Sequence, residues 1–165
     1  MKDSGYIQEI YQASYGRLVA QIYAITADRV EAEDAVQEAF ARAVASGSRF
    51  SRVDKPEAWL RTVALNVVRR RWRRASLFRA LAPRIATPAA VPGISDDHVA
   101  VVQALRALPF QQRETLALFY LADLPVDEIA ATLGVAEGTV KSRLTRGRTA
   151  LAALMGTTPQ EADHG

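Results

Sequence analysis

Two helices joined by a tight turn are predicted by the stretch Asp123-Leu-Pro-Val-Asp-Glu-Ile-Ala-Ala-Thr-Leu-Gly-Val-Ala-Glu-Gly-Thr-Val-Lys-Ser-Arg-Leu-Thr-Arg-Gly-Arg-Thr-Ala-Leu151. Pro125 suits the first turn of a helix, because its missing N–H is not needed there. Gly134 stands where that helix would end in a left-handed residue. A second helix can begin near Glu137, whose negative charge suits a helix N-terminus.

The second of these helices divides into an apolar side and a polar side. At about 100° per residue, the apolar side contains Val140, Leu144, Gly147 and Leu151. The opposite side contains Thr139, Ser142, Thr145 and Arg146, and it is flanked by Lys141, Arg143 and Arg148. Short hydroxyls and long cationic side chains suit the base edges and phosphates of a DNA major groove. The helix is therefore predicted to bind DNA; the alternative is a solvated basic helix that closes a small bundle.

The composition excludes several classes of site. The 165 residues allow one domain or two small ones, and the absence of cysteine excludes disulfides, thiol redox sensing and cysteine–zinc sites. His98 and His164 lie far apart, and no nucleophile–base pair or phosphate-binding loop is present. We therefore expect no catalytic residue, no metal and no cofactor. Because the sequence contains neither a long apolar run nor a signal peptide, we expect a cytoplasmic protein without membrane insertion.

The net charge of +3 is unevenly distributed, with acids near residues 28–38 and arginines near residues 69–74. A helix predicted from Asp28 to Val44 has a buried stripe of Ala32, Val36, Phe40 and Ala43. Its other side carries Glu33, Asp34, Gln37 and Glu38. An acidic face repels nucleic acid and suits a basic protein surface. The alternative is an ordinary solvated face.

A basic helix is predicted from Asp54 to about Arg74, with Pro56 in its first turn. Its expected core positions are Trp59, Leu60, Val63 and Val67. Another face carries Thr62, Asn66, Arg69 and Arg73, and the helix ends in Arg69-Arg-Arg-Trp-Arg-Arg74. So dense a run of cations predicts a nucleic-acid-binding face rather than a merely solvated one. In the preceding loop, residues 46–54, Phe50 lies between arginines and is expected to be exposed, which suits stacking on an unpaired base.

The remaining segments complete an all-α prediction. An amphipathic helix with a weak point at Gly16 is predicted over residues 6–25, a shorter helix ends near Leu108, and another begins at Pro109. The residues of this last helix that are expected to face inward are Leu116, Phe119 and Tyr120. Residues 80–97 are rich in proline and alanine, as in a flexible linker. The expected fold is therefore two small helical domains joined by that linker, the second domain containing the helix-turn-helix.

Several motifs, in this order, resemble those of the extracytoplasmic-function (ECF) sigma factors of bacterial RNA polymerase, within the sigma-70 family. They are Ala32-Glu-Asp-Ala-Val-Gln-Glu-Ala-Phe40, Lys55-Pro-Glu-Ala-Trp-Leu-Arg-Thr-Val-Ala-Leu-Asn66 followed by Arg69 to Arg74, Leu105-Arg-Ala-Leu-Pro-Phe-Gln-Gln-Arg113, and Glu128-Ile-Ala through Thr139-Val-Lys-Ser-Arg143. The resemblance covers nearly all of residues 6–153. It implies sigma region 2 over residues 1–79, a linker over 80–97, sigma region 4 over 98–155 and a disordered tail over 156–165.

The resemblance also implies roles for particular residues. Core RNA polymerase would be bound by Glu33, Asp34, Gln37 and Glu38. The melted −10 promoter element would be bound by Phe50, Thr62, Asn66, Arg69, Arg70, Arg73 and Arg74, with Asn66 and the Phe50 loop holding a flipped base. The duplex −35 element would be bound by Thr139, Lys141, Ser142, Arg143, Thr145 and Arg146. An anti-sigma factor is a further partner that the family implies.

Two other functions are compatible with the residues themselves. One is a free-standing transcriptional repressor or activator that uses the same helix-turn-helix, although this leaves the acidic face unexplained. The other is a basic RNA-binding adaptor that uses residues 69–74. Two positions depart from the family pattern. Ala35 stands where the family usually carries a larger apolar residue, and Gly147 replaces a common alanine, which costs up to ~1 kcal/mol in helix propensity.

Overall fold

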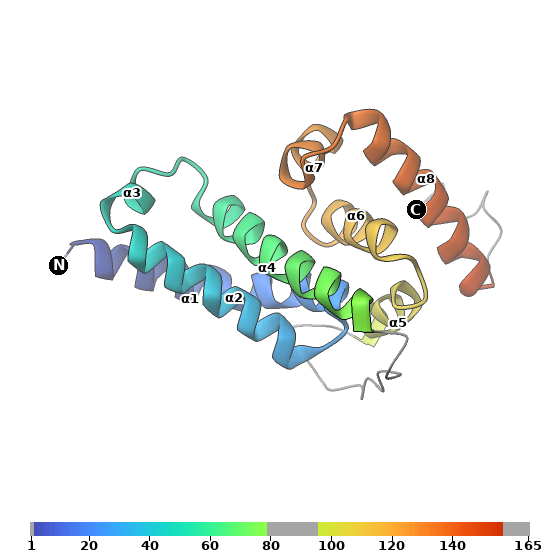
Figure 1. The fold of residues 1–165 in the computed structure, drawn as a ribbon, viewed down its shortest axis with the longest axis horizontal. Helices are drawn as coiled ribbons and strands as arrows, with labels where there is room; N and C mark the ends of the chain where they lie inside the picture. The colour runs from blue at the N-terminus through green and yellow to red at the C-terminus, as the bar shows by residue number, and fades with distance from the viewer. Residues whose placement is uncertain (1, 79–95, 157–165) are drawn as a thin grey trace. The chain divides into compact units, whose positions relative to one another are not determined.

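The computed structural model describes residues 2–78 and 96–156, and the regular elements within these residues are α-helices (Figure 1). The described residues form two compact units, one on each side of residues 79–95. The prediction of two helical domains is therefore confirmed. The predicted linker lies almost wholly within residues 79–95, and the predicted tail almost wholly within residues 157–165, both outside the described residues.

The first domain contains three long helices and one short one. They are α1 (Lys2–Thr26), α2 (Arg29–Ser46), α3 (Ser48–Ser51) and α4 (Pro56–Phe78). Helix α1 continues through Gly16 without a break, and α2 packs against both α1 and α4. The helix α2 begins where predicted, because the carboxylate of its N-cap residue Asp28 accepts a hydrogen bond from the Glu31 N–H at 3.0 Å.

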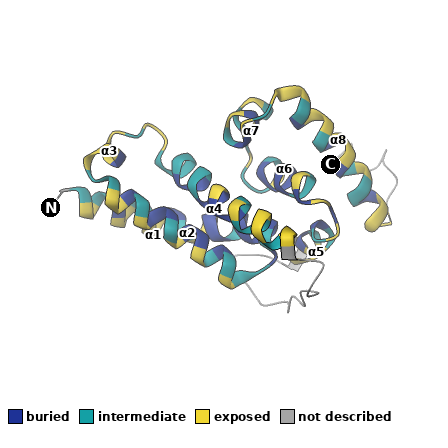
Figure 2. Cartoon of the chain, in the orientation of Figure 1, coloured by how far each residue is buried: buried dark blue, intermediate teal, exposed yellow. Residues whose placement is uncertain are grey.

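Helix α2 buries one complete side, as the sequence predicted. Its buried residues are Ala32, Ala35, Val36, Ala39, Phe40 and Ala43. Figure 2 shows this buried side in dark blue against an exposed outer side. Because alanine side chains are small, α1 and α4 can both lie close to the α2 backbone.

The core side of α4 differs in detail from the prediction. Its buried apolar residues are Leu60, Ala64, Leu65, Val67 and Val68, whereas Trp59 and Val63 are only half-buried. The core also contains a polar pair that the sequence did not indicate. The Arg61 Nε donates a hydrogen bond to Gln21 Oε1 on α1 at 2.9 Å, and both side chains are buried. A buried guanidinium requires such an acceptor, so Gln21 helps to hold α4 against α1.

The prediction that Phe50 is an exposed stacking residue is wrong. Residues Ser48–Ser51 form the short helix α3, and the Phe50 side chain is only 1% exposed. Its ring packs edge-on against Trp59, with centroids 5.1 Å apart, and lies 6.1 Å from the Tyr6 ring. The turn of helix directs the apolar ring into the core, where burial of an aromatic side chain is strongly favourable.

The second domain contains four described helices. They are α5 (Asp96–Leu105), α6 (Phe110–Tyr120), α7 (Val126–Leu133) and α8 (Glu137–Leu154). Helix α5 ends three residues before the predicted Leu108. In α6 Leu116 is buried as expected, but Phe119 is half-buried and Tyr120 is 46% exposed. The Tyr120 hydroxyl stays at the surface because it accepts a hydrogen bond from Arg148 Nε at 2.7 Å.

The turn between α7 and α8 has the predicted glycine geometry. Gly134 lies in the left-handed region at φ 67° and ψ 37°, where a side chain is disfavoured. The N–H groups of Gly134 and Val135 both donate to the Ala130 carbonyl, which closes the end of α7. Pro125 is the N-cap residue of α7 rather than a residue of its first turn.

The buried side of α8 contains Val140, Leu144, Gly147 and Ala152, whereas Leu151 is half-buried. Gly147 has a packing role that the sequence did not reveal. A Cβ atom at this position would lie 2.8 Å from Leu116 Cδ1 and 3.1 Å from Leu116 Cγ. The glycine therefore allows α8 to approach α6 more closely than alanine would, which offsets its lower helix propensity.

Replacing Gly147 with alanine is expected to destabilise the second domain. Alanine gains up to ~1 kcal/mol in helix propensity, but overpacking of a filled core costs about 1–3 kcal/mol. Native-state hydrogen exchange of the α8 amides would measure the difference. The control is Gly138→Ala in the same helix, where a Cβ meets nothing within 4 Å and stability should be unchanged or higher. Increased protection in Gly147→Ala would show that Leu116 moves aside at little cost.

Replacing Phe50 with alanine is expected to lower the free energy of unfolding of the first domain by about 3–5 kcal/mol, the usual cost of a large aromatic-to-alanine change in a core. Both tryptophans of the chain, Trp59 and Trp72, lie in this domain, so tryptophan fluorescence during urea unfolding reports on it alone. Arg52→Ala, at an exposed position beside α3, is the control and should change stability by less than about 0.5 kcal/mol. Wild-type stability in Phe50→Ala would contradict the core role.

Candidate nucleic-acid and protein interfaces

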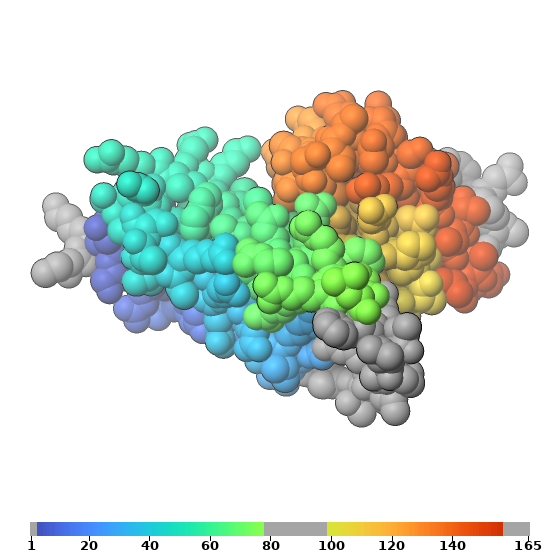
Figure 3. Space-filling view, viewed as in Figure 1, coloured from blue at the N-terminus to red at the C-terminus, as the bar shows by residue number. Residues whose placement is uncertain are grey.

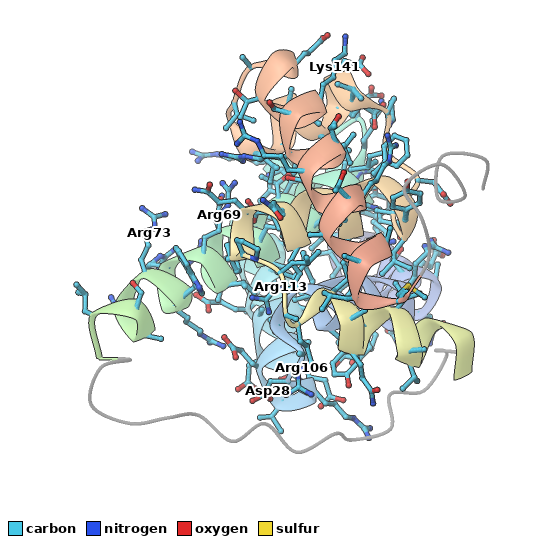
Figure 4. The ribbon with its side chains drawn as sticks, turned by 90° about the vertical axis from the view of Figure 1, so that its right-hand side faces the viewer. Asp28, Arg69, Arg73, Arg106, Arg113 and Lys141 are labelled. Carbon is cyan, nitrogen blue, oxygen red and sulfur yellow. The ribbon has the colours of Figure 1, made fainter. Side chains whose placement is uncertain are left out.

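The outer side of α8 is accessible along its length. Lys141, Ser142, Thr145 and Arg146 are exposed, and Thr139 and Arg143 are half-buried. Lys141 projects away from the helix in Figure 4. The Thr145 hydroxyl donates to the Lys141 carbonyl at 3.0 Å, so toward a ligand it offers an acceptor and a methyl group. Cations, hydroxyls and a methyl group on one side match the groups presented by base pairs and phosphates in a major groove.

The Arg148 side chain contacts two aromatic residues of its own domain, Phe119 and Tyr120. Its guanidinium carbon lies 5.2 Å from the centroid of the Phe119 ring and 5.7 Å from that of Tyr120, and its Nε donates to the Tyr120 hydroxyl. The side chain therefore joins α8 to the end of α6 by cation–π contacts and one hydrogen bond. The sequence placed Arg148 beside the DNA-binding residues but did not indicate these aromatic partners.

The basic side of α4 carries the residues predicted to bind the −10 element. Asn66, Arg70, Arg73 and Arg74 are exposed, and Thr62 and Arg69 are half-buried. Arg69 and Arg73 project from the same side of α4 in Figure 4, and the second half of α4 lies at the surface of its domain in Figure 3. The Thr62 hydroxyl donates to the Ala58 carbonyl at 3.0 Å. A cationic surface of this kind suits a phosphate backbone.

One arginine of this run is directed toward α2. Arg71 Nη2 lies 3.8 Å from Glu38 Oε2, and the second oxygen of that carboxylate accepts a 2.9 Å hydrogen bond from Arg42 Nη2. Glu38 is thus shared by two arginines from two helices. Exposed pairs of this kind contribute about 0–1 kcal/mol each, so a partner protein could displace them at little cost.

The predicted acidic face of α2 is less acidic than the sequence suggested. Asp34 and Gln37 are exposed, and Glu33 and Glu38 are half-buried. Glu33 pairs with Arg29 at 3.0 Å, and Glu38 pairs with arginines as above. Asp34 makes no ion pair with any residue that the structure describes. The accessible negative charge is therefore centred on Asp34.

An aromatic pair beside this face was not identified from the sequence. Tyr11 and Tyr15 are one helical turn apart on α1, and their rings stack with centroids 4.6 Å apart. The ring of Phe40 on α2 lies edge-on to Tyr11 at 5.0 Å. The Gln37 Nε2 donates to the Tyr15 hydroxyl at 3.3 Å, and burial raises the pKa of Tyr15. The i, i+4 spacing of the tyrosines was visible in the sequence, but it indicated only core packing.

The accessible surfaces offer hydrogen bonds, charge and aromatic stacking. No group of three or more His, Cys, Asp or Glu side chains within residues 2–78 and 96–156 is arranged to hold a metal ion. In the same part of the chain, no helix combines the length and apolar character needed to cross a bilayer.

Both domains match known protein families. Residues 10–78 match the family described as Sigma-70 region 2, and residues 98–151 match the family described as Sigma-70, region 4. Each family match falls within one of the two helical units, and their order along the chain agrees with the predicted one.

Curated relatives and a solved structure extend this match. The chain is 35% identical over 129 residues to the ECF RNA polymerase sigma factor SigL of Mycobacterium tuberculosis. This alignment covers 73% of this chain and 72% of SigL. It is 32% identical over 160 residues to a protein described as probable RNA polymerase sigma factor RfaY of Xanthomonas campestris, which covers 83% of this chain. The chain spans only 39% of RfaY and 65% of the M. tuberculosis relative SigM.

One similar solved structure is the sigma factor RpoE of Bartonella quintana in complex with the anti-sigma factor NepR. It is 27% identical, with a TM-score of 0.71, and the match covers 92% of this chain and 97% of that one. The two region matches and the similarity to SigL lead to one conclusion: the chain belongs to the ECF family of RNA polymerase sigma factors.

Proposed function

We propose that this chain is a promoter-specificity subunit, which binds core RNA polymerase and directs transcription initiation by recognising the −35 and −10 elements and stabilising melted DNA. The observation that supports this most strongly is the presence of sigma regions 2 and 4 in one chain, together with the exposed or half-buried position of every predicted interface residue except Phe50. The proposed role is recognition without catalysis, in the cytoplasm where the polymerase works.

We assign duplex recognition to residues 98–155. The exposed side chains of α8, including Lys141 and Arg146, would enter the major groove of the −35 element, and half-buried Arg143 would lie beside them. A bidentate arginine contact to a base is worth about 1–3 kcal/mol of discrimination. The cation–π contacts of Arg148 with α6 would hold the helix at a fixed angle during this recognition.

We assign polymerase binding and DNA melting to residues 1–79. Asn66, exposed on α4, would hydrogen-bond to a base flipped from the −10 element, while Arg70, Arg73 and Arg74 bind the backbone. Since Phe50 is buried, the base would be held without it. Unpairing costs a few kcal/mol, and contacts to each unpaired base return about 1–3 kcal/mol.

Residues 80–97 would connect the domain that binds the −10 element to the domain that binds the −35 element. Once one domain is bound, the connection makes the second contact effectively intramolecular, which raises the overall affinity without any new contact. The complex of RpoE with NepR supports the further proposal that an anti-sigma factor regulates this chain. Such a factor would act by covering one or both DNA-binding surfaces.

Replacing Asp34 with arginine is expected to abolish co-elution of this chain with core RNA polymerase on gel filtration, because Asp34 is the exposed acid of α2 that forms no ion pair with a described residue. Glu9→Arg on α1 makes the same charge change at an exposed position of the same domain and should leave co-elution unchanged. Failure of the wild-type chain to co-elute, with duplex binding intact, would favour the free-standing repressor.

Replacing Arg146 or Asn66 singly with alanine is expected to impair different steps, recognition of the −35 element and capture of melted bases respectively. Each variant therefore serves as the control for the other. Arg146→Ala should weaken use of the −35 element by about 1–3 kcal/mol, with little effect on scrambled sequence. Asn66→Ala should spare duplex binding and reduce the permanganate reactivity of melted bases in the polymerase complex. Equal losses on specific and scrambled sequence would mean that Arg146 contacts only phosphate. Normal permanganate reactivity would remove Asn66 from the base site.

A further inference from the structure

Tyr11 and Tyr15, which we call the tyrosine patch, form an aromatic surface on the outside of α1. Tyr11 is 40% exposed, and its ring lies nearly parallel to that of Tyr15, with 23° between the planes. Phe40 of α2 is buried behind the pair and lies edge-on to Tyr11. The rings are therefore held in place by packing while the Tyr11 ring remains accessible, and such rigid aromatic surfaces are favoured at protein interfaces.

The tyrosine patch is continuous with the outer side of α2. Gln37, which the resemblance to sigma factors implies in polymerase binding, donates a hydrogen bond from its amide to the Tyr15 hydroxyl. The same side of α2 carries a regularly spaced exposed stripe of Val30, Asp34, Gln37, Ala41 and Val44. Its end residues are large and apolar, with Val30 67% and Val44 63% exposed. The stripe thus combines apolar ends with a polar and acidic middle, beside which the tyrosines lie.

We propose that the tyrosine patch is part of the polymerase-binding surface and receives a cationic side chain, preferably arginine, from a basic surface of core polymerase. This inference rests on the proposed function of the chain. A guanidinium can stack on a tyrosine ring and at the same time pair with a nearby carboxylate. Exposed Asp34 provides such a carboxylate on the adjoining face of α2, and Glu33, which pairs with Arg29, lies beside it.

The charges around the tyrosine patch disfavour two other ligands, an unpaired nucleic-acid base and a second copy of this chain. An unpaired nucleic-acid base could stack on tyrosine, but its phosphates would meet the carboxylates of Glu33 and Asp34. A second copy of this chain, docked symmetrically, would bring the same acidic face against itself. A basic protein surface avoids both conflicts, and the two exposed valines of α2 give it apolar area to cover.

The test measures the dissociation constant of the full chain for core RNA polymerase. Tyr11→Ala is expected to weaken binding about ten-fold or more, as removal of a central aromatic side chain from an interface does. Tyr11→Phe keeps the ring and should bind within about two-fold of wild type. Tyr15→Phe loses the hydrogen bond to Gln37 and should weaken binding by about two- to five-fold. The control is Glu9→Ala, which alters an exposed residue on another side of α1.

Thermal unfolding of each variant separates binding from folding. If Tyr11→Ala loses its wild-type transition, Tyr11→Lys replaces it, because the aliphatic stem of lysine can cover Phe40 while its charge repels a cation. A folded variant of either kind that binds polymerase like wild type overturns the inference and leaves the proposed function intact. Absence of polymerase binding by the wild-type chain overturns the proposed function itself. Loss of self-association, with polymerase binding unchanged, would assign the patch to a second copy instead.

Discussion

The first domain depends on the close packing of α2 between α1 and α4. Four alanines of α2 are completely buried, and side chains of that size let both neighbouring helices approach its backbone. With one side of α2 buried in this way, only a narrow outer stripe remains free to meet another protein. The surface proposed for polymerase binding is therefore a consequence of how the core is packed, and substitutions that enlarge the alanines would move the interface as well as weaken the fold.

In the first domain, an ion pair joins the acidic face of α2 to the basic helix α4. Glu38 belongs to the acidic face of α2, yet it lies 3.8 Å from Arg71 of the basic helix α4. An exposed pair at this distance is weak and easily screened. Arg71 is half-buried beside this carboxylate, whereas Arg70, Arg73 and Arg74 are exposed.

In the second domain, two contacts of different chemistry join α8, the proposed DNA-binding helix, to α6. The absence of a side chain at Gly147 allows α8 to touch Leu116 of α6. One residue further along, Arg148 stacks on the aromatic rings at the end of α6. The first contact sets how closely the helices pack, and the second holds α8 against the end of α6. Together they keep the outer side of α8 turned away from the core and available to a ligand.

The sequence by itself determined the helices other than α3, the left-handed turn at Gly134, the buried stripe of α2 and the accessible polar sides of α2, α4 and α8. These features follow from local chemistry, namely residue periodicity, capping and turn preference, which act within a few residues of the chain. Only the tertiary structure decided that Phe50 is buried, that Gly147 is a close contact, and that Tyr15 joins the α2 face. In each case the deciding partner, such as Trp59, Leu116 or Gln37, lies outside the local segment. Whether a side chain is buried or exposed depends on which distant surface it meets, and helical periodicity carries no information about that surface.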